Sequence, residues 1–341
     1  MKDIKIIGLD LAKSIFYIHG VNSRGKTVLQ KKLKRAELLP FFANLPHCLV
    51  GMETGGGAHY WAREIMAAGH EVKIMAAQFV KPYIKTNKSD TNDAEGICEA
   101  VTRPTMRFVA VKTAAQQDIQ CVHRIRERIV KSRTALSNEI RGFLTEYGIV
   151  LDTGIRVLQK SLFSVLSDET NQLTPTTRRI IQELFHEFLV ISERLKELNK
   201  QIETIRKNNP VAKRLSEIPG IGPLAATAII ALIGDHTLFK NGREFSAYLG
   251  LVPKHRGSGG KQQNLGISKR GDRYIRKMLI HGARAQLAHI GRLNRVDKRS
   301  KWATQLKDRA GFNKTTVALA NKNARTAWSA MNQGDKFKYV A

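Results

Sequence analysis

Two short apolar runs near the amino terminus each meet a carboxylate at their end. Residues 4–9 are apolar apart from one lysine and are followed by Asp10, and the apolar residues 48–52 are followed by Glu53. Runs of this length and character predict buried strands. A carboxylate at a buried strand end is costly, so a cluster of such acids requires cations to neutralise it.

Two more acids open a helix-like segment that begins at residue 90. Asp90 and Asp93 are three residues apart, which places both carboxylates on one face of a helix. The same spacing also suits a helix cap, with Asp90 at the N-cap and an acid three residues on, and the two roles can coexist. Together with Asp10 and Glu53 the pair predicts a site for two Mg²⁺ ions, or Mn²⁺ in their place. Such a pair of ions is the usual clamp for cutting or joining phosphodiesters.

The amino-terminal third predicts an α/β domain over residues 1–108. Its expected elements alternate in type: strands at residues 4–9, 15–21 and 27–33, a helix at 37–45, a strand at 48–52, a helix at 58–67, a strand at 71–75 and a helix from 90. This order, with acids at strand ends and on the last helix, is that of a ribonuclease-H-like fold.

Long helices follow over residues 109–209, and a mainly α domain over residues 210–331 precedes a short polar tail at 332–341. Apolar residues recur three and four positions apart across residues 181–205, which is the seam of a coiled coil. The seam fits either an intermolecular dimerisation arm or a hairpin within one chain. Because the apolar stripe is narrow, a coiled-coil dimerisation arm is the favoured interpretation.

Charge restricts the partners. The 57 Lys and Arg residues against 29 acids give a net charge of +28 and a pI near 10.3, which favours a polyanion such as nucleic acid. A membrane partner is not expected, because the longest uncharged stretch, residues 218–234, is short and broken by prolines and glycines. The three cysteines lack metal-ligand spacing, which indicates reduced thiols and a cytosolic protein.

The second half holds two candidate contacts for phosphate. The glycine turn at residues 218–222 can present backbone N–H groups to a phosphate, although it also fits a tight turn beneath a core helix. Residues 253–284 contain nine Lys or Arg and one acid. Within them Ser258, flanked by glycines and cations, is a candidate nucleophile, or a residue of a flexible loop. The expected nucleic-acid contacts are Gly220, Gly222, Lys254, Arg256, Lys261, Lys269, Arg270, Arg273, Arg276 and Lys277.

Five motifs occur in a fixed order along the chain. They are Leu9-Asp10-x-Ala12-Lys13, Met52-Glu53-Thr54-Gly55-Gly56, Lys88-Ser89-Asp90-Thr91-Asn92-Asp93-Ala94, Ile218-Pro219-Gly220-Ile221-Gly222, and Gly250-Leu251-Val252-Pro253 followed by Ser258-Gly259. Over nearly its whole length the sequence resembles the DEDD transposases of bacterial insertion sequences, the group that includes the Piv DNA invertase.

The resemblance implies a RuvC-like domain in which Asp10, Glu53, Asp90 and Asp93 hold Mg²⁺, with Ser258 as the nucleophile. Ser258 lies five residues beyond Pro253, as the family's serine does beyond its proline. The resemblance also implies a recombinase guided by a structured RNA from its own element. That enzyme would join target and donor DNA in the bacterial cytoplasm, at the nucleoid. It would act as a tetramer of two dimers, with composite active sites built by different protomers.

Two other functions are compatible with the residues. A RuvC-like nuclease or junction resolvase would hydrolyse DNA with water and leave Ser258 without a chemical role. A basic RNA- or DNA-binding protein with a decayed nuclease fold is the third, and the presence of all four acids argues against it. A covalent protein–DNA adduct would distinguish the recombinase from the hydrolase.

Overall fold

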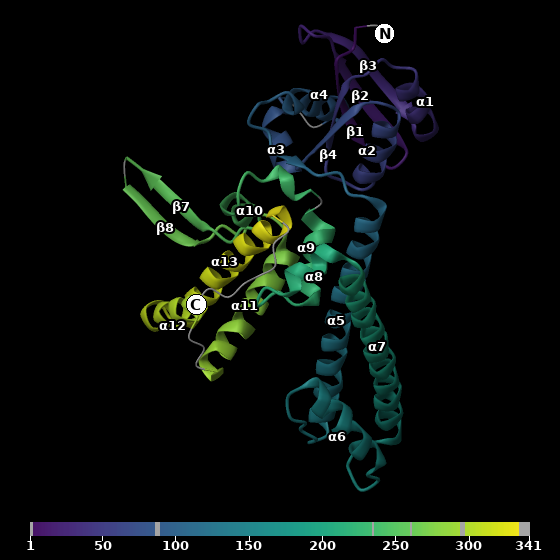
Figure 1. Ribbon diagram of the computed structural model, residues 1–341. Coiled ribbons are helices and arrows are strands. Elements are labelled where there is room, and N and C mark those ends of the chain that lie inside the picture. Colours follow the sequence, from purple (N-terminus) through teal and green to yellow (C-terminus); the bar gives the residue numbers. More distant parts are fainter. Residues whose placement is uncertain (1–2, 86–88, 234, 260, 294–296, 334–341) are drawn as a thin grey trace. The chain divides into compact units, whose positions relative to one another are not determined.

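The computed structural model describes residues 3–85, 89–233, 235–259, 261–293 and 297–333, which form two compact units (Figure 1). The first unit comprises Met1–Gln116 and Ile233–Leu238, and the second comprises Gln117–Leu232 and Phe239–Ala341. Within the described ranges, no helix is both long enough and apolar enough to cross a membrane.

The first unit is built on one mixed sheet of six strands, in the order β3-β2-β1-β4-β5-β6. The strands are β1 (Ile6–Leu11), β2 (Ile15–Val21), β3 (Thr27–Lys34), β4 (Leu49–Glu53), β5 (Glu71–Met75) and β6 (Phe108–Val109). The first three pair antiparallel, whereas β1, β4 and β5 run parallel to one another. The five long strands were predicted from the sequence; β1 ends two residues later than expected and β4 one residue later, so that Asp10 and Glu53 lie within them.

Helices cover both faces of this sheet (Figure 1). One face packs against α1 (Leu38–Ala43) and α2 (Ala58–Ala67), the other against α3 (Ala77–Val80) and α4 (Asp90–Val101). Short 3₁₀ turns precede α1 (Arg35–Glu37) and follow α3 (Lys81–Tyr83). Side chains alternate along each strand, so β1 sends Ile7 and Leu9 into the core with α1 and α2, while Ile6 packs on the α4 side. Asp10, four residues after Ile6, therefore also faces α4.

The second unit is mainly helical, and its elements follow one another along the chain. They are α5 (Ala114–Glu146, whose first turn belongs to the first unit), α6 (Ile155–Ser167), α7 (Pro175–Asn208), α8 (Pro210–Ser216), α9 (Pro223–Ile233), α10 (Gly242–Tyr248), strands β7 (Pro253–Ser258) and β8 (Lys261–Ile267), α11 (Arg273–Leu293), α12 (Lys298–Ala310) and α13 (Phe312–Gln333). A 3₁₀ turn at His236–Leu238 belongs to the first unit.

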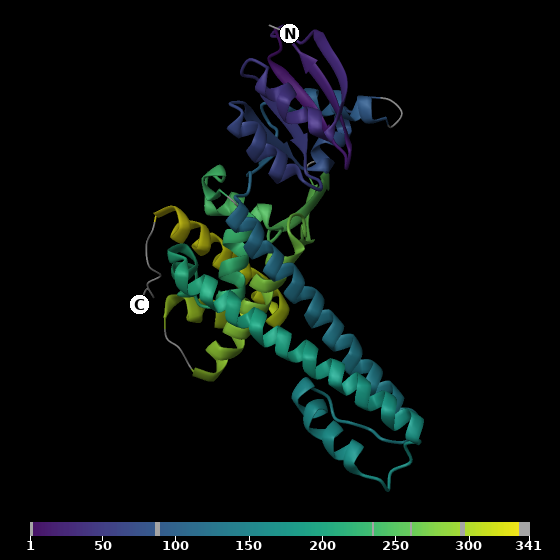
Figure 2. The ribbon, with the colours of Figure 1, turned by 90° about the vertical axis from the view of Figure 1, so that its right-hand side faces the viewer.

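Helices α5 and α7 run side by side in opposite directions, with α6 packed near the end where the chain turns back (Figure 2). The apolar residues of α7 are buried within this chain: Ile181 and Phe188 pack with Leu136 and Ile140 of α5, and Leu195 packs with α5 nearer its start. The seam predicted over residues 181–205 is therefore covered by α5 of the same chain. This packing is the intramolecular alternative.

The remaining helices of the second unit gather around α13, which contacts α8, α10, α11 and α12. The segment around Ser258, expected as a loop, is instead the antiparallel hairpin β7–β8. Sequence periodicity missed it because both strands are rich in lysine, arginine, glutamine and glycine rather than in the β-branched and aromatic residues typical of strands.

Candidate active site

Three of the four predicted acids come together on the α4 face of the sheet. Asp10 projects from β1, and Asp90 and Asp93 project from the first turn of α4. One carboxylate oxygen from each of the three lies within 4.8 Å of the others. Separations of this size allow a single divalent cation to be shared by oxygen ligands.

Helix α4 begins in a way that leaves both of its acids available. Ser89, rather than Asp90, is the N-cap, and its hydroxyl oxygen accepts a hydrogen bond from the Asn92 N–H at 3.3 Å. The capping role expected for Asp90 is therefore wrong, because the residue before it already performs that role. The helix dipole, positive at this end, favours the negative charge that the two aspartates bring.

Two glycines determine how closely α4 lies against the strands that carry the acids. A Cβ atom at Gly8 would come within 2.0 Å of the Ala94 carbonyl oxygen, and one at Gly51 within 2.8 Å of the Val101 side chain. Each glycine stands two residues before an acid, Asp10 or Glu53, on the same strand face. Reasoning from the sequence missed this role, although the repeated order of glycine, apolar residue and acid in both strands was a usable signal.

The repulsion among the carboxylates of the cluster favours the binding of a cation. Burial, followed by the nearby charges of Asp93, Asp90 and Glu53, raises the pKa of Asp10 to about 6. In addition, Oδ1 of Asp93 is buried and has no hydrogen-bond partner among the described residues. Carboxylates that repel one another, one of them with an oxygen that has no donor, fit a hard divalent cation.

Glu53 lies at the end of β4, beside β1 in the parallel pair. It is not one of the three acids whose oxygens lie within 4.8 Å of one another. Its charge nevertheless acts on Asp10, since Glu53 contributes to the raised pKa of that carboxyl. Alternation from Leu49, which packs on the α4 side, also directs Glu53 toward that side. Glu53 is therefore a neighbour of the cluster rather than a member of its inner group.

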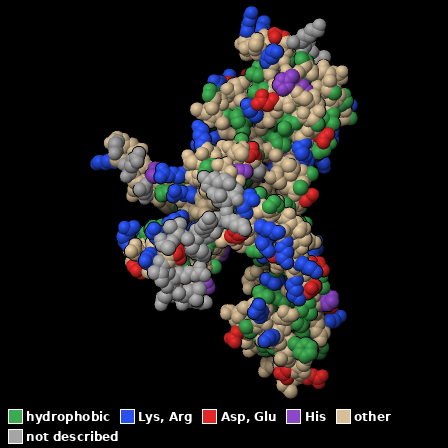
Figure 3. Space-filling model, viewed as in Figure 1, with side chains coloured by type: hydrophobic (Ala, Val, Ile, Leu, Met, Phe, Trp, Pro, Cys, Tyr) green, Lys and Arg blue, Asp and Glu red, His purple; other side chains and the backbone are tan. Residues whose placement is uncertain are grey.

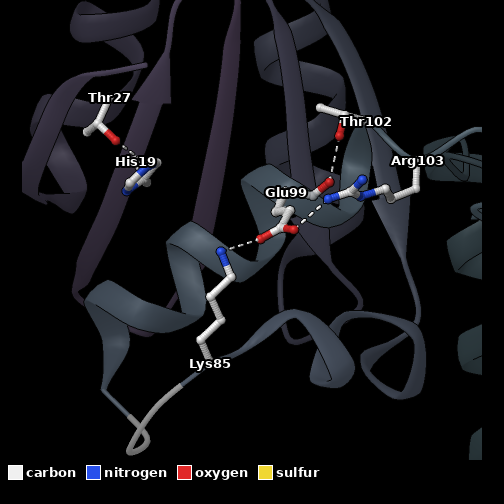
Figure 4. A network of polar contacts seen from close by, with 6 residues as sticks. All are labelled: His19, Thr27, Lys85, Glu99, Thr102 and Arg103. Atoms are coloured by element: carbon white, nitrogen blue, oxygen red, sulfur yellow. Dashed lines mark hydrogen bonds and ion pairs between the residues drawn. The ribbon is translucent and has the colours of Figure 1, made fainter. Parts of the chain in front are cut away.

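Glu99, which follows Asp93 on α4, is held by ion pairs (Figure 4). Its carboxylate pairs with Lys85 at 3.0 Å and with Arg103 at 2.5 Å, and hydrogen bonds with these two residues lower its pKa. The Thr102 hydroxyl donates to the Glu99 backbone carbonyl at 2.7 Å. Because both carboxylate oxygens have cationic partners, Glu99 does not take part in the acid cluster.

Ser258 lies at the tip of the β7–β8 hairpin, in the second unit. It is exposed, and in the strand register it stands opposite Lys261. Gly259 follows with a φ of 56°, a left-handed backbone conformation suited to the tight turn. The hairpin thus presents the Ser258 and Lys261 side chains to solvent.

The ten residues predicted to contact nucleic acid differ in their surroundings. Those at the hairpin and just after it are exposed: Lys254, Arg256, Lys261, Lys269, Arg270 and Arg273. Arg276 is 9% exposed, and its guanidinium donates to the carbonyl oxygens of Leu249 and Arg270 at 3.3 and 3.0 Å. Arg276 therefore holds the segment before α11 in place. Lys277 is half-buried and pairs with Glu127 of α5 at 2.5 Å.

The glycine turn before α9 also has a packing role. Gly220 has a φ of 86°, and a Cβ there would lie within 2.7 Å of the Asn323 side chain and 3.1 Å of the Gly282 carbonyl oxygen. Only glycine allows α11 and α13 to approach the turn this closely. Gly222 is exposed and has open space where a side chain would begin, so packing does not require glycine there.

Two family models and several known proteins match this chain. Residues 7–149 match the DEDD family model of the IS110 transposases, whose description is "Transposase", and residues 212–299 match the model described as "Transposase IS116/IS110/IS902 family". The chain is 45% identical over 328 residues to a "Probable family 20 transposase" of Pseudomonas aeruginosa, covering 96% of each chain. The chain belongs to the IS110/IS116 family of DEDD transposases.

Two further transposases are similar over nearly their full lengths. The "Transposase for insertion sequence element IS1111A" of Coxiella burnetii is 43% identical, over 99% of this chain and 92% of that protein. The "Transposase for insertion sequence element IS1328" of Yersinia enterocolitica is 38% identical, over 99% of both. This transposase is accordingly an enzyme that cleaves and recombines DNA. Its DEDD domain implies a RuvC-like fold and indicates the use of a divalent metal.

Proposed function

We propose that this transposase is an RNA-guided DNA recombinase of an insertion sequence, which cuts and exchanges strands through Ser258 and a Mg²⁺-dependent acid site. The observation that carries the proposal is the cluster of Asp10, Asp90 and Asp93, whose carboxylate oxygens lie within 4.8 Å of one another. Such a cluster is costly to keep without a cation, and in a DNA-cleaving enzyme it suits the phosphoryl-transfer site.

The metal ligands in this proposal are Asp10, Asp90 and Asp93, with Glu53 completing the set. The buried, unpartnered Oδ1 of Asp93 and the raised pKa of Asp10 support the assignment. Mg²⁺ ions, or Mn²⁺, would supply Lewis-acid stabilisation of the negative charge that develops on the phosphate. The protein's part is to hold the carboxylates in register, through β1, β4 and the glycine contacts with α4.

Ser258 acts as the nucleophile. Its Oγ attacks a phosphorus atom of the DNA backbone, so an Oγ–P bond forms and the P–O3′ bond breaks. The serine proton leaves to solvent, and the departing 3′ oxygen takes up a proton to give a free 3′-hydroxyl. Because the phosphodiester is retained as phosphoserine, a 3′-hydroxyl from another strand can reverse the step without a nucleotide cofactor. Exposure of Ser258 at a hairpin tip, opposite Lys261, supports this role.

A structured RNA from the same element would select the target and donor DNA by base pairing. The protein would then need chiefly backbone and shape contacts, which matches a net charge of +28 and the exposed cations at the hairpin. The protein would work in the bacterial cytoplasm, on nucleoid DNA.

A tetramer of two dimers completes the proposal. Several large apolar side chains of the α5–α6–α7 region are exposed, although the seam of α7 is covered within the chain. Phe163 is 71% exposed, Val190 55% and Phe143 41%. Exposed apolar side chains gathered on neighbouring helices suit contact with a second copy.

The decisive experiment compares Ser258→Ala with the wild type in a reaction containing Mg²⁺, both DNA partners and the co-purified RNA. Ser258→Ala is expected to bind DNA normally but to form no covalent adduct and no recombinant product. Peptide mapping of the denatured wild-type reaction should place the nucleotide on the peptide that contains Ser258. Ser164→Ala, at an exposed serine of α6, is the control and should react as the wild type does.

Persistent DNA cutting by Ser258→Ala would contradict the serine mechanism. It would favour the alternative, a RuvC-like nuclease or resolvase in which water is the nucleophile and the acid cluster suffices. Attachment of the nucleotide to another serine or to a tyrosine would show that the nucleophile is a different residue.

A further inference from the structure

A cavity of about 450 Å³ lies between α5, α6, α7 and α11, entirely within the second unit. Six cationic side chains line it against a single carboxylate, that of Glu127. The cations are Arg126, Lys131, Arg133, Arg156, Lys196 and Lys277. Like charges that converge on one concavity repel one another, so the arrangement is favourable only when an anion enters.

The protein's own acids do not neutralise this cavity. Glu127 is engaged by Lys277 at 2.5 Å, and Arg126 donates instead to the amide oxygen of Asn199 at 2.7 Å. Lys196 pairs with Glu193 at 2.7 Å, but that pair is exposed and stabilises little. Across the described ranges, the remaining three cations make no ion pair with a carboxylate: Lys131, Arg133 and Arg156.

Two buried polar atoms at the cavity also lack partners. The Nε of Arg133, on α5, and the Oγ of Ser192, on α7, are both inaccessible to solvent and make no hydrogen bond with any described residue. Burial and the charge of Arg126 lower the pKa of Arg133, which reflects the cost of holding a guanidinium there. A partly buried guanidinium with an unpartnered Nε is costly to hold, and an anion bound beside its charge offsets part of that cost.

We propose that this cavity binds a backbone phosphate of nucleic acid. The phosphate oxygens would accept hydrogen bonds from the terminal nitrogens of Arg133, and the surrounding lysines and arginines would balance the phosphate charge. A phosphate alone is smaller than the cavity, and the apolar side chains of Val130, Ile155 and Met278 can take the attached sugar. In Figure 3, Lys and Arg side chains gather over the part of the molecule where α5 runs, which gives a strand a cationic approach.

This inference goes beyond the proposed function, because it needs neither Ser258 nor the acid cluster. It adds a contact on α5, α6 and α7, outside the basic segment at residues 253–284 except for Tyr274, Lys277 and Met278. Its test is therefore made without Mg²⁺, in chelator, so that binding is measured separately from cleavage. If the cavity proves not to bind nucleic acid, the proposed chemistry of Ser258 and the acid cluster is unaffected. If that chemistry is refuted, the binding site in the cavity is unaffected.

The experiment measures fluorescence anisotropy of the full-length protein with three labelled polymers of one sequence: duplex DNA, single-stranded DNA and single-stranded RNA. The affinity is followed over a range of salt concentrations for wild type, Arg133→Gln and Arg128→Gln. Arg128 is the matched control, because it lies on α5, is exposed and does not line the cavity. For at least one polymer, Arg133→Gln should weaken binding roughly tenfold and flatten the slope of log K against log salt by about 0.7–0.9, the loss of one phosphate contact.

The polymer that shows this loss identifies the strand that enters the cavity. Equal behaviour of Arg133→Gln and Arg128→Gln with all three polymers would overturn the proposal. Should Arg133→Gln fail to fold, Lys131→Gln takes its place, since Lys131 lines the cavity at its exposed side. Its control is Lys160→Gln, an exposed lysine of α6 outside the cavity. Equal slopes for that pair would also reject the proposal.

Discussion

Asp10 keeps its charge on a strand whose neighbouring side chains are apolar, against three other carboxylates. Its pKa is raised to about 6, above the ordinary 3.8, so the metal-free fold loses stability as pH rises through this interval. The loss is on the order of 1–2 kcal/mol for a half-buried group. Neutral pH is thus where the site most requires a cation, and where its occupancy most affects folding.

Asp10→Asn tests this balance. At neutral pH and in chelator, the variant is expected to melt a few degrees above the wild type, because one repelling charge is gone. Added Mg²⁺ should raise the melting temperature of the wild type but not that of Asp10→Asn, and the variant should cleave no DNA. Differential scanning fluorimetry with and without Mg²⁺ gives both readings. A variant with wild-type cleavage would refute the assigned site.

His123 is a buried histidine with a fixed tautomer. The Thr227 hydroxyl donates to the Pro223 carbonyl, so it accepts from Nε2–H of His123 at 2.9 Å, and Nδ1 then accepts from the Tyr274 hydroxyl at 3.0 Å. Burial, with Arg126 nearby, lowers its pKa to about 4. His123 therefore stabilises the packing of α5, α9 and α11 only in its neutral form.

The sign of the pH effect follows from the depressed pKa. Stability from His123 is complete above its ordinary pKa of 6.5 and declines as pH falls toward 4, by about 2 kcal/mol between pH 7.5 and 4.5. Urea unfolding across this range should show a shallower pH dependence for His123→Gln than for the wild type. His186→Gln, at an exposed position of α7, should keep the wild-type slope. Parallel curves for His123→Gln and the wild type would contradict this role.

At the scale of elements, the order of strands and helices in the first unit could be predicted because periodicity and turn residues agreed there. The end of β4 and the start of α4 were predictable for the same reason, and the acids with them. The contact between α4 and the sheet was not, since it depends on Gly8 and Gly51, whose roles are visible only once the helix lies beside them. The hairpin that carries Ser258 was missed because polar strands have no apolar alternation to detect.

Helix α7 carries both buried and exposed apolar residues, and substitutions at the two kinds of position are expected to have different effects. Leu195 is 4% exposed and packs on α5, so Leu195→Asp should destabilise the chain by about 3 kcal/mol or more, seen as a lower urea midpoint. Val190 is 55% exposed, so Val190→Asp should leave the urea midpoint nearly unchanged and lower the oligomer mass in light scattering. An unchanged mass for Val190→Asp, with Phe163→Asp likewise inert, would place the oligomer contact elsewhere.

At the scale of the whole molecule, the acids and the candidate nucleophile belong to separate units of one chain. In the sequence, the change from alternating strands to long helices predicts a boundary near residue 108. The sequence could not indicate whether one chain or two supply a complete site, because that depends on assembly. A chain-exchange experiment answers this question directly.

Asp10→Asn and Ser258→Ala are each expected to be inactive alone. If different protomers contribute the acids and the serine, co-expressed mixed oligomers should regain a fraction of the wild-type recombination, since some sites combine an intact acid cluster with an intact serine. Recombination assays on purified mixed oligomers, carrying a different tag on each variant, measure this fraction. As a control, Asp10→Asn mixed with Asp93→Asn should stay inactive. No recovery in the first mixture would indicate that each chain completes its own site.

The close approach of α4 to Gly8 bears on how copies of such an element lose activity. An insertion sequence persists as many copies, each of which accumulates changes independently. A copy with alanine at position 8 would keep all four acids and Ser258, yet its helix could not lie where the Ala94 carbonyl now sits. Surveys that score a copy as active from its acidic residues alone would count a copy with alanine at position 8 as functional. Gly8 and Gly51 should therefore be checked, together with the acids and Ser258, when a copy of the element is scored as active or inactive.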